Sequence, residues 1–295
     1  MEDIYYTIFT FLPIKDIMNS RLVNRLFYKV SKLEILWEVK FDNNFNESNI
    51  FKINYFETCK YCVMLQKLSK DIKYQQSYID LYNLQWLSLS GKQPITIPKE
   101  LGQLKNLRTL CLSNNQLTTI PKELFQLNNL EWLYLDLNYI YTIPKELGQL
   151  KNLRVLYLHG NKLITIPKEL GELTNLHQLY LSNNCLARIP KGLFQLNNLH
   201  VLKLFQNHLT SIPKELGQLN NLHNLDLCCN KLAAIPKELS QLNNLEVLDL
   251  SNNQLTTIPK ELGLLNNLQT LNLANNQLTT IPHEITQLNN LRIIR

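Results

Sequence analysis

The residues best suited to metal or proton chemistry are three histidines spaced 23 residues apart, His177, His200 and His223. Equal spacing predicts a column of imidazoles on neighbouring turns of a repeating chain, about 4.8 Å apart if those turns are paired strands. Such a column can ligate zinc or act as a pH-sensitive cluster. Repetition of the sequence alone also produces a solvated column, and we favour that simpler interpretation, with no metal site and no cofactor.

Two cysteines form another candidate site, because Cys59 and Cys62 have Cys-x-x-Cys spacing. A structural zinc site needs two further ligands nearby, but the next cysteine is Cys111 and the first histidine is His159. A redox motif belongs beside a strand–helix–strand unit, which the surrounding sequence does not predict. We therefore expect buried thiols, and the scattered cysteines favour a reducing, intracellular compartment.

The common catalytic motifs are missing from the sequence. It contains no phosphate-binding G-x-x-x-x-G-K-[ST] loop, no G-x-G-x-x-G, no G-x-S-x-G and no H-E-x-x-H motif. No pair of carboxylates stands apart from the residues that recur in every copy of the repeat. The sequence therefore predicts a binding protein and not an enzyme.

A 23-residue repeat occupies most of the chain, with nine full copies from Leu84 and a partial tenth from Leu291. Each copy approximates the pattern L-x-x-L-x-L-x-x-N-x-L, in which two leucines spaced two apart point to one side of a short strand. The asparagine follows at a turn, where its amide can satisfy backbone groups that would otherwise be buried unpaired. One copy buries too little apolar surface to fold alone, so the copies must stack and share a core.

This pattern resembles the leucine-rich repeat, whose period lies in the same range. The resemblance implies an α/β leucine-rich-repeat solenoid over residues 84–295, with parallel strands on its concave face. The return path of each coil then closes the core from the convex side. Residues 291–295 are expected to pair as one short strand that lays Leu291 and Ile294 over the edge of the core.

The concave face is the candidate binding surface, because its outward strand positions vary between copies whereas the scaffold positions hardly change. Exposed aromatic side chains on such a surface are typical of protein interfaces. The alternative is cross-strand stacking that only stabilises the sheet. The candidate residues are Trp86, Trp132, Tyr134, Asp136, Tyr157, His159, Tyr180, Lys203, Phe205, Asp226 and Asp249.

Residues 1–83 lack the repeat, and their apolar spacing predicts short helices. Within residues 1–41, four segments occur in a fixed order: Ile8-Phe9-Thr10-Phe11-Leu12-Pro13, Asp16-Ile17, Leu22-Val23-Asn24-Arg25-Leu26-Phe27-Tyr28 and Leu36-Trp37. These segments resemble the F-box family, although the family's leading Leu-Pro is absent and Asn24 replaces its usual cysteine. Residues 42–83 are predicted to form a helical linker and N-terminal cap.

The F-box resemblance implies a small all-α domain that docks a Skp1-like adaptor. An F-box followed by leucine-rich repeats is a familiar pairing. The low-Gly composition, rich in Asn, Lys, Ile and Tyr, is similar to F-box proteins of large DNA viruses of amoebae, which would imply a virus–host interaction in the host cytoplasm. The candidate Skp1-binding residues are Ile8, Phe9, Leu12, Pro13, Leu22, Val23 and Trp37.

The charge distribution does not favour nucleic acid or a membrane as a partner. The net charge is only +6, and the lysine of the recurring Pro-Lys-Glu tripeptide is followed by a glutamate. Glu2 and Asp3 precede the first apolar run, where a signal peptide carries basic residues. No apolar stretch is long enough to span a bilayer. We therefore expect an intracellular, cytoplasmic protein.

Two functional hypotheses follow. In the first, the chain is an adaptor whose concave face binds a target protein while residues 1–41 recruit Skp1 and a cullin ubiquitin ligase. In the second, the chain is a scaffold or recognition protein outside the ubiquitin system, and its N-terminal helices only cap the solenoid.

Overall fold

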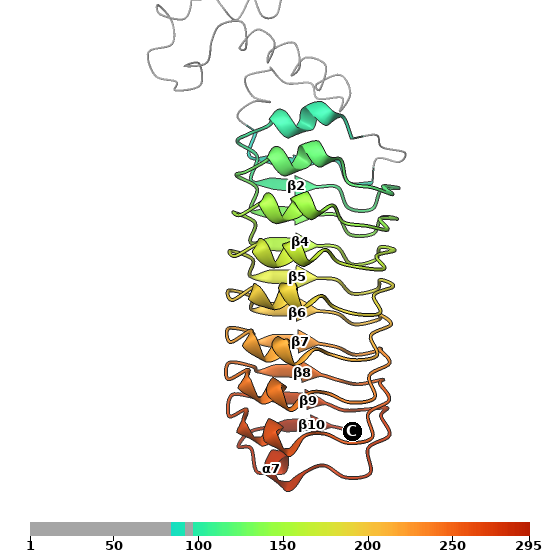
Figure 1. Cartoon of the computed structure of the whole chain (residues 1–295), viewed down its shortest axis with the longest axis vertical. Helices are drawn as coiled ribbons and strands as arrows, with labels where there is room; N and C mark the ends of the chain where they lie inside the picture. The colour runs from blue at the N-terminus through green and yellow to red at the C-terminus, as the bar shows by residue number, and fades with distance from the viewer. Residues whose placement is uncertain (1–83, 92–96) are drawn as a thin grey trace, which may run out of the picture. The chain divides into compact units, whose positions relative to one another are not determined.

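Each copy of the repeat forms one coil, and each coil contributes a three-residue strand to one parallel sheet, as Figure 1 shows. The structure, a computed structural model, describes residues 84–91 and 97–295, all within the unit Tyr82–Arg295. The F-box-like segments, Cys59 and Cys62 lie outside the described residues. The strands are β1 (Trp86–Ser88), β2 (Thr109–Cys111), β3 (Trp132–Tyr134), β4 (Val155–Tyr157), β5 (Gln178–Tyr180), β6 (Val201–Lys203), β7 (Asn224–Asp226), β8 (Val247–Asp249), β9 (Thr270–Asn272) and β10 (Arg292–Ile294).

The middle residue of strands β1 to β9 is a leucine that points into the solenoid, as the buried Leu133, Leu156 and Leu179 do. Its two neighbours point outward. From β1 to β9 the strands pair with equal repeat positions opposite each other, so that Tyr157 faces Tyr180. Outward side chains therefore form columns that run along the solenoid. The predicted parallel-strand solenoid is confirmed.

Strand β10 departs from this register. A constant period would place Ile293 opposite Thr270, but the structure pairs Arg292 with Thr270 and Ile293 with Leu271. Just before the strand, Asn290 adopts a positive φ of 61°, which alters the path of the chain. The expected short strand is confirmed, but the expected placement of Ile294 is wrong, because Ile294 faces Asn272 on the outward side.

A ladder of buried asparagines joins consecutive coils. The Asn184 amide nitrogen donates to the carbonyls of Leu158 and Leu181, each at 3.0 Å. Its Oδ1 accepts the backbone N–H of Leu163 from the preceding coil, also at 3.0 Å. The predicted role of this asparagine is therefore confirmed. Equivalent residues in the described coils are Asn115, Asn138, Asn161, Asn207, Asn230, Asn253 and Asn276.

A second asparagine ladder lies on the surface at the last position of the repeat. Here the Asn198 amide donates to the carbonyl oxygen of Thr174 in the preceding coil, at 2.9 Å. This role was not predicted from the repeat pattern. The same contact is made by Asn129, Asn152, Asn175, Asn221, Asn244 and Asn267.

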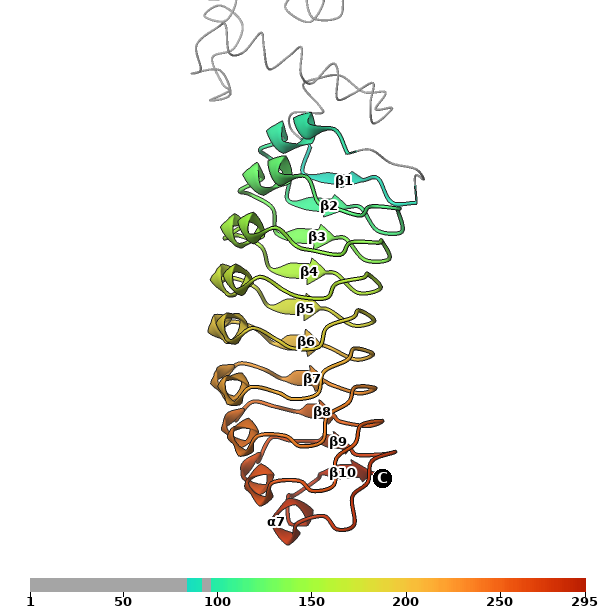
Figure 2. The same ribbon diagram turned by 45° about the vertical axis from the view of Figure 1, so that its right-hand side comes forward.

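Short helices form the return path, and Figure 2 shows them along the outer side of a gentle arc, with the strands on the inner side. A proline precedes each helix, and a leucine or isoleucine packs inward from it. No described helix is long or apolar enough to cross a membrane. The 3-10 helices are η2 (Lys99–Gln103), η3 (Lys122–Gln126), η4 (Lys145–Gln149), η5 (Lys168–Glu172), η6 (Lys191–Gln195), η7 (Lys214–Gln218), η8 (Lys237–Gln241) and η9 (Lys260–Leu264), and the last helix is α7 (His283–Thr286).

The turn after each strand from β1 to β9 holds one residue in the left-handed region of backbone space. Asparagine or glycine fills this position in most coils, as expected from their tolerance of positive φ. Leu137, Gln206 and Cys229 are the exceptions, with φ of 55°, 53° and 54°.

Leu137 is the apolar one of the three. Its side chain extends over Gly160 of the next coil, where an added Cβ would lie 2.8 Å from Leu137 Cδ2.

Candidate functional site

The outward side chains of β1 to β9, together with the residue two positions after the end of each strand, form the candidate surface, hereafter the strand face. Three tyrosines stack at its centre. The rings of Tyr134 and Tyr157 lie 4.8 Å apart at an interplanar angle of 12°, and those of Tyr157 and Tyr180 lie 4.2 Å apart at 4°. In-register pairing causes this stack, because it places the three side chains directly beside each other.

Stacking leaves the three tyrosine rings half-buried, and not fully exposed as the sequence analysis expected. The rings cover one another, so this part of the strand face also stabilises the sheet. Burial, followed by interactions with Tyr157, raises the pKa of Tyr180 to about 12. Burial also raises the pKa of Tyr134. The Tyr134 and Tyr180 hydroxyls therefore stay protonated to a higher pH than an ordinary tyrosine, and the Tyr180 hydroxyl donates to Gln178 Oε1 at 3.0 Å.

The other aromatic candidates lie on the same face with different exposure. Trp86 on β1 is 59% exposed. Trp132 and Phe205 are half-buried. In the sequence, Trp132 lies two residues before Tyr134, and Phe205 lies two residues after Lys203. The predicted aromatic residues therefore do share one face, although their exposure varies.

Asp136 and His159 also belong to the strand face, but Asp136 is only 8% exposed. Its carboxylate accepts a hydrogen bond from the Ser113 hydroxyl at 2.7 Å. His159 Nε2 lies 3.8 Å from the other carboxylate oxygen. The His159 ring also meets Tyr157 edge-on at 6.0 Å between centroids. Asp136 thus acts mainly by holding its neighbours in place.

The column that contains the tyrosines continues into charged residues on β6, β7 and β8. Asp226 and Asp249 are directly opposite each other in the register. The Lys203 ammonium donates to Asn224 Oδ1 at 2.7 Å and lies 3.6 Å from Asp226 Oδ2. The strand face therefore changes along one column from aromatic to acidic.

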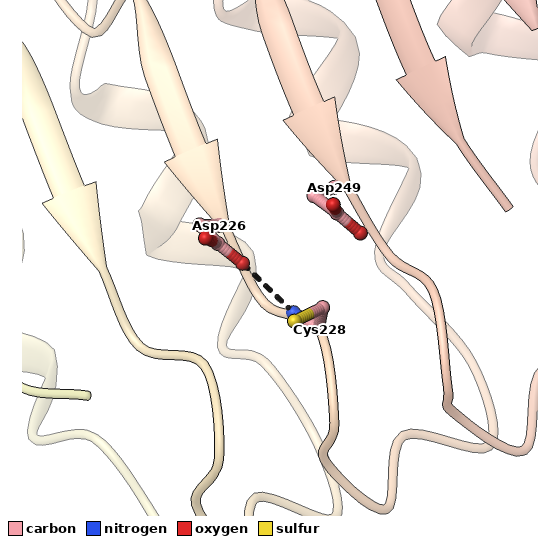
Figure 3. Close-up of side chains that lie close together, drawn as sticks. All are labelled: Asp226, Cys228 and Asp249. Atoms are coloured by element: carbon pink, nitrogen blue, oxygen red, sulfur yellow. Dashed lines mark hydrogen bonds between the residues drawn. The ribbon is translucent and has the colours of Figure 1, made fainter. Parts of the chain in front are cut away.

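Cys228 joins these aspartates in a cluster that the sequence analysis did not identify, and Figure 3 shows its three side chains. Among the described residues this is the group whose ligand atoms could hold a metal ion, since they lie within 4.8 Å of one another. Cys228 donates its backbone N–H to Asp226 Oδ1 at 3.1 Å.

Internal partners already occupy much of this cluster. Asp249 Oδ1 accepts the Ser251 hydroxyl at 2.6 Å, and its Oδ2 accepts the Asn272 amide at 3.0 Å. Burial, and then the charge of Asp226, raises the pKa of the Cys228 thiol. The thiolate, which is the form that ligates metals, is therefore disfavoured at neutral pH. This arrangement does not favour a metal ion at the cluster.

The three histidines do form the predicted column, with ring centroids 5.1 and 5.2 Å apart. Each Nδ1 contacts the carbonyl oxygen of an asparagine two residues earlier, as His177 does with Asn175 at 2.6 Å. Two nitrogens bound to one zinc ion lie about 3.3 Å apart. The imidazole rings here are nearly parallel and more than 5 Å apart, so their Nε2 atoms do not converge on one point. This geometry favours the interpretation as a solvated column.

An apolar group at the turn edge of the third and fourth coils was also missed. Its members are between 48% and 58% exposed: Leu137, Tyr139, Tyr141 and Ile164. Lys162 Nζ lies 5.9 Å from the centroid of the Tyr139 ring. A signal was available in the sequence, because most other copies carry small or polar residues at these positions. The Skp1-binding candidates, in contrast, all lie outside the described residues: Ile8, Phe9, Leu12, Pro13, Leu22, Val23 and Trp37.

Family models match this chain over nearly all of its repeats. A model described as "Leucine rich repeat" matches residues 82–140 and 220–278, and one described as "Leucine-rich repeat region" matches residues 132–239. Among curated protein sequences, none matches the chain.

Solved structures show the same fold. A leucine-rich repeat protein of Leptospira interrogans is 44% identical, with a TM-score of 0.71, over 77% of this chain and 57% of that protein. The ectodomain of the Arabidopsis thaliana receptor kinase GASSHO1/SCHENGEN3, in complex with CASPARIAN STRIP INTEGRITY FACTOR 2, is 37% identical over 72% of this chain, with a TM-score of 0.65. The plant peptide hormone receptor RGFR1, in complex with RGF2, is 34% identical over 68% of this chain, with a TM-score of 0.57.

The chain spans 57% of the Leptospira protein, and 27% and 37% of the two plant receptor chains. Its matches to both family models and to these structures agree with the 23-residue period and the parallel sheet. The chain belongs to the leucine-rich repeat family.

Proposed function

We propose that this chain is a non-catalytic adaptor that holds a target protein on its strand face. The observation that carries the proposal is the contrast between two sets of positions. Core leucines and ladder asparagines recur in almost every described coil, whereas the in-register outward column changes from tyrosine to lysine to aspartate. The stacking of coils needs the first set at every repeat, whereas in the second set the tyrosine row alone adds stacked rings to the sheet. The second set is free to recognise a partner.

The solved relatives support this assignment. Two plant receptors of the same family were solved with a bound factor, CASPARIAN STRIP INTEGRITY FACTOR 2 in one case and RGF2 in the other. The leucine-rich repeat is also a typical non-enzymatic scaffold for protein interactions. Binding through the repeats is therefore the function that best fits the described surface.

The second half of the proposal concerns residues 1–41, which we infer dock a Skp1-like adaptor and thereby recruit a cullin ubiquitin ligase. Its support is the F-box resemblance from Ile8 to Trp37. An adaptor of this kind acts by effective concentration, because one chain holds both partners and the chemistry takes place elsewhere. This proposal includes an intracellular location.

Binding of purified Skp1 tests the adaptor half. The wild-type chain is expected to bind Skp1 at micromolar concentration in calorimetry, and the variant Leu12→Ala with Pro13→Ala is expected to lose that binding. Tyr157→Ala with Tyr180→Ala serves as the control, since it changes the strand face alone and should leave Skp1 affinity unchanged. If wild type shows no binding to Skp1, the chain is a scaffold outside the ubiquitin system.

Matched affinity capture tests the recognition half. Three immobilised baits are compared: wild type, the strand-face variant Tyr157→Ala with Tyr180→Ala, and the helix-side variant Lys237→Ala with Lys260→Ala. Both lysines are exposed on the return path. A target of the strand face is retained by wild type and by the helix-side variant, and is lost on the strand-face variant. Equal retention by all three baits contradicts the proposal.

A further inference from the structure

We propose that the strand face takes an extended peptide segment of its partner, with an apolar side chain on the tyrosine row and a basic side chain between Asp226 and Asp249. This inference rests on the proposed function and specifies the partner chemistry. Its carrying observation is that Tyr134, Tyr157, Tyr180, Lys203, Asp226 and Asp249 occupy one unbroken column across β3 to β8.

The acidic end of the column has one counter-charge for two carboxylates. Asp226 and Asp249 are opposite each other in the sheet, and like charges at such positions are destabilising. Lys203 approaches only Asp226, while the partners of Asp249 are the uncharged Ser251 and Asn272. One lysine thus faces two carboxylates, in a chain whose overall net charge is +6.

The neighbouring outward positions add no positive charge. Asn224 and Val247 precede the two aspartates on their strands, and Cys228 and Ser251 follow two residues later. Burial raises the pKa of Cys228, so its thiol is neutral at physiological pH. A guanidinium or ammonium group from the partner supplies the missing charge. A phosphate backbone would be repelled, and this argues against a nucleic acid partner.

The aromatic end offers a different surface. The stacked tyrosines are half-buried, and the raised pKa values of Tyr134 and Tyr180 keep these two hydroxyls uncharged at physiological pH. Trp132 and Val201 lie on the neighbouring column. Such a surface accepts an aliphatic or aromatic side chain, because apolar contact here needs no counter-charge.

The register sets the separation of the two contacts. From Tyr157 on β4 to Asp249 on β8 there are four strand spacings, or about 19 Å at roughly 4.8 Å each. An extended chain advances about 3.3 Å per residue, so this distance corresponds to roughly six residues. The expected segment runs along the solenoid and carries an apolar residue and an arginine or lysine about six positions apart.

Selection from a random twelve-residue peptide library on phage tests the inference, with the whole chain as bait. Wild type is expected to enrich peptides with this apolar-to-basic spacing. The variant Asp226→Asn with Asp249→Asn keeps acceptor oxygens for Cys228 and Ser251, so it should fold, and it should retain the apolar preference only. Tyr157→Ala with Tyr180→Ala should retain the basic preference only. Circular dichroism confirms that each bait is folded.

The decisive test exchanges the charges of the peptide's basic residue and of Asp249. The consensus peptide with its basic residue changed to glutamate should bind wild type at least tenfold more weakly, about 1.4 kcal/mol, and Asp249→Lys should recover that peptide. If the enriched peptides depend on the tyrosines but lack a basic residue, this inference is wrong and the proposal that the strand face binds a partner still stands. Peptides insensitive to both double variants would overturn the proposed function as well. Failure to enrich any peptide would overturn only the inference, because the partner would then not bind as a short segment.

Discussion

Removal of one ladder asparagine, by Asn184→Ala, should cost clearly more stability than removal of an exposed asparagine that also joins two coils. Asn184 is buried, and its Oδ1 is the acceptor for the Leu163 N–H at 3.0 Å. Alanine leaves that N–H buried and unpaired, which costs about 1–3 kcal/mol. The carbonyls of Leu158 and Leu181 keep one asparagine donor each, from Asn161 and Asn207, so we expect them to add only about 1 kcal/mol together. The expected loss is about 2–4 kcal/mol.

Asn198→Ala is the matched control. This asparagine also joins two coils, through a 2.9 Å hydrogen bond to the Thr174 carbonyl, but it is exposed. Water can replace the lost donor, so the expected loss is under about 1 kcal/mol. Urea unfolding followed by circular dichroism measures both variants against wild type. Equal losses for Asn184→Ala and Asn198→Ala would refute the reasoning that burial, and not the cross-coil contact itself, gives the ladder its strength.

Three further predictions concern packing and ionisation. Gly171→Ala should destabilise the chain by about 1–3 kcal/mol in urea unfolding, because a Cβ would overlap the carbonyl oxygen of Gly192, whereas Ser240→Ala at the equivalent position should be nearly neutral. Tyr157→Ala removes both stacked pairs and should lower the unfolding free energy by about 1–3 kcal/mol, and an unchanged value would show that the stack does not stabilise the sheet. Tyr180 has a raised pKa of about 12 in the folded chain, so its stabilising contribution is complete below the unfolded pKa of about 10 and is lost as the pH rises from there through about 12. Ultraviolet titration of wild type and Tyr180→Phe should show that Tyr180 ionises at a higher pH than an ordinary tyrosine. Ionisation of Tyr180 near pH 10, the ordinary pKa of tyrosine, would contradict the raised pKa.

The constant period made much of the fold predictable. It implied that equal positions stack, and therefore that Tyr134, Tyr157 and Tyr180 would share one column. The buried role of Asn184 followed from the same reasoning, because a turn inside a solenoid leaves backbone groups to satisfy. These predictions depend only on periodicity and on hydrogen-bond chemistry.

Features that depend on local backbone geometry were not predictable in the same way. The one-residue shift of β10 accompanies a left-handed Asn290, and the repeat pattern carries no sign of it. Half-burial of the tyrosines results from how closely the rings stack, which spacing alone does not specify. The Cys228 cluster needs a turn that brings residue 228 back beside Asp249. The F-box resemblance of residues 1–41 stays a prediction.

Photo-crosslinking from the strand face tests the central claim most directly. Benzoylphenylalanine is placed at Val201, a half-buried outward residue of β6 between the tyrosine row and the aspartates, or at Lys237 on the helix side. The probe is the consensus peptide from wild-type selection or, if none is enriched, the purified captured target. A binding strand face predicts a crosslink from position 201 that excess unlabelled ligand removes, and none from position 237. A crosslink from position 237 with none from position 201 would contradict it.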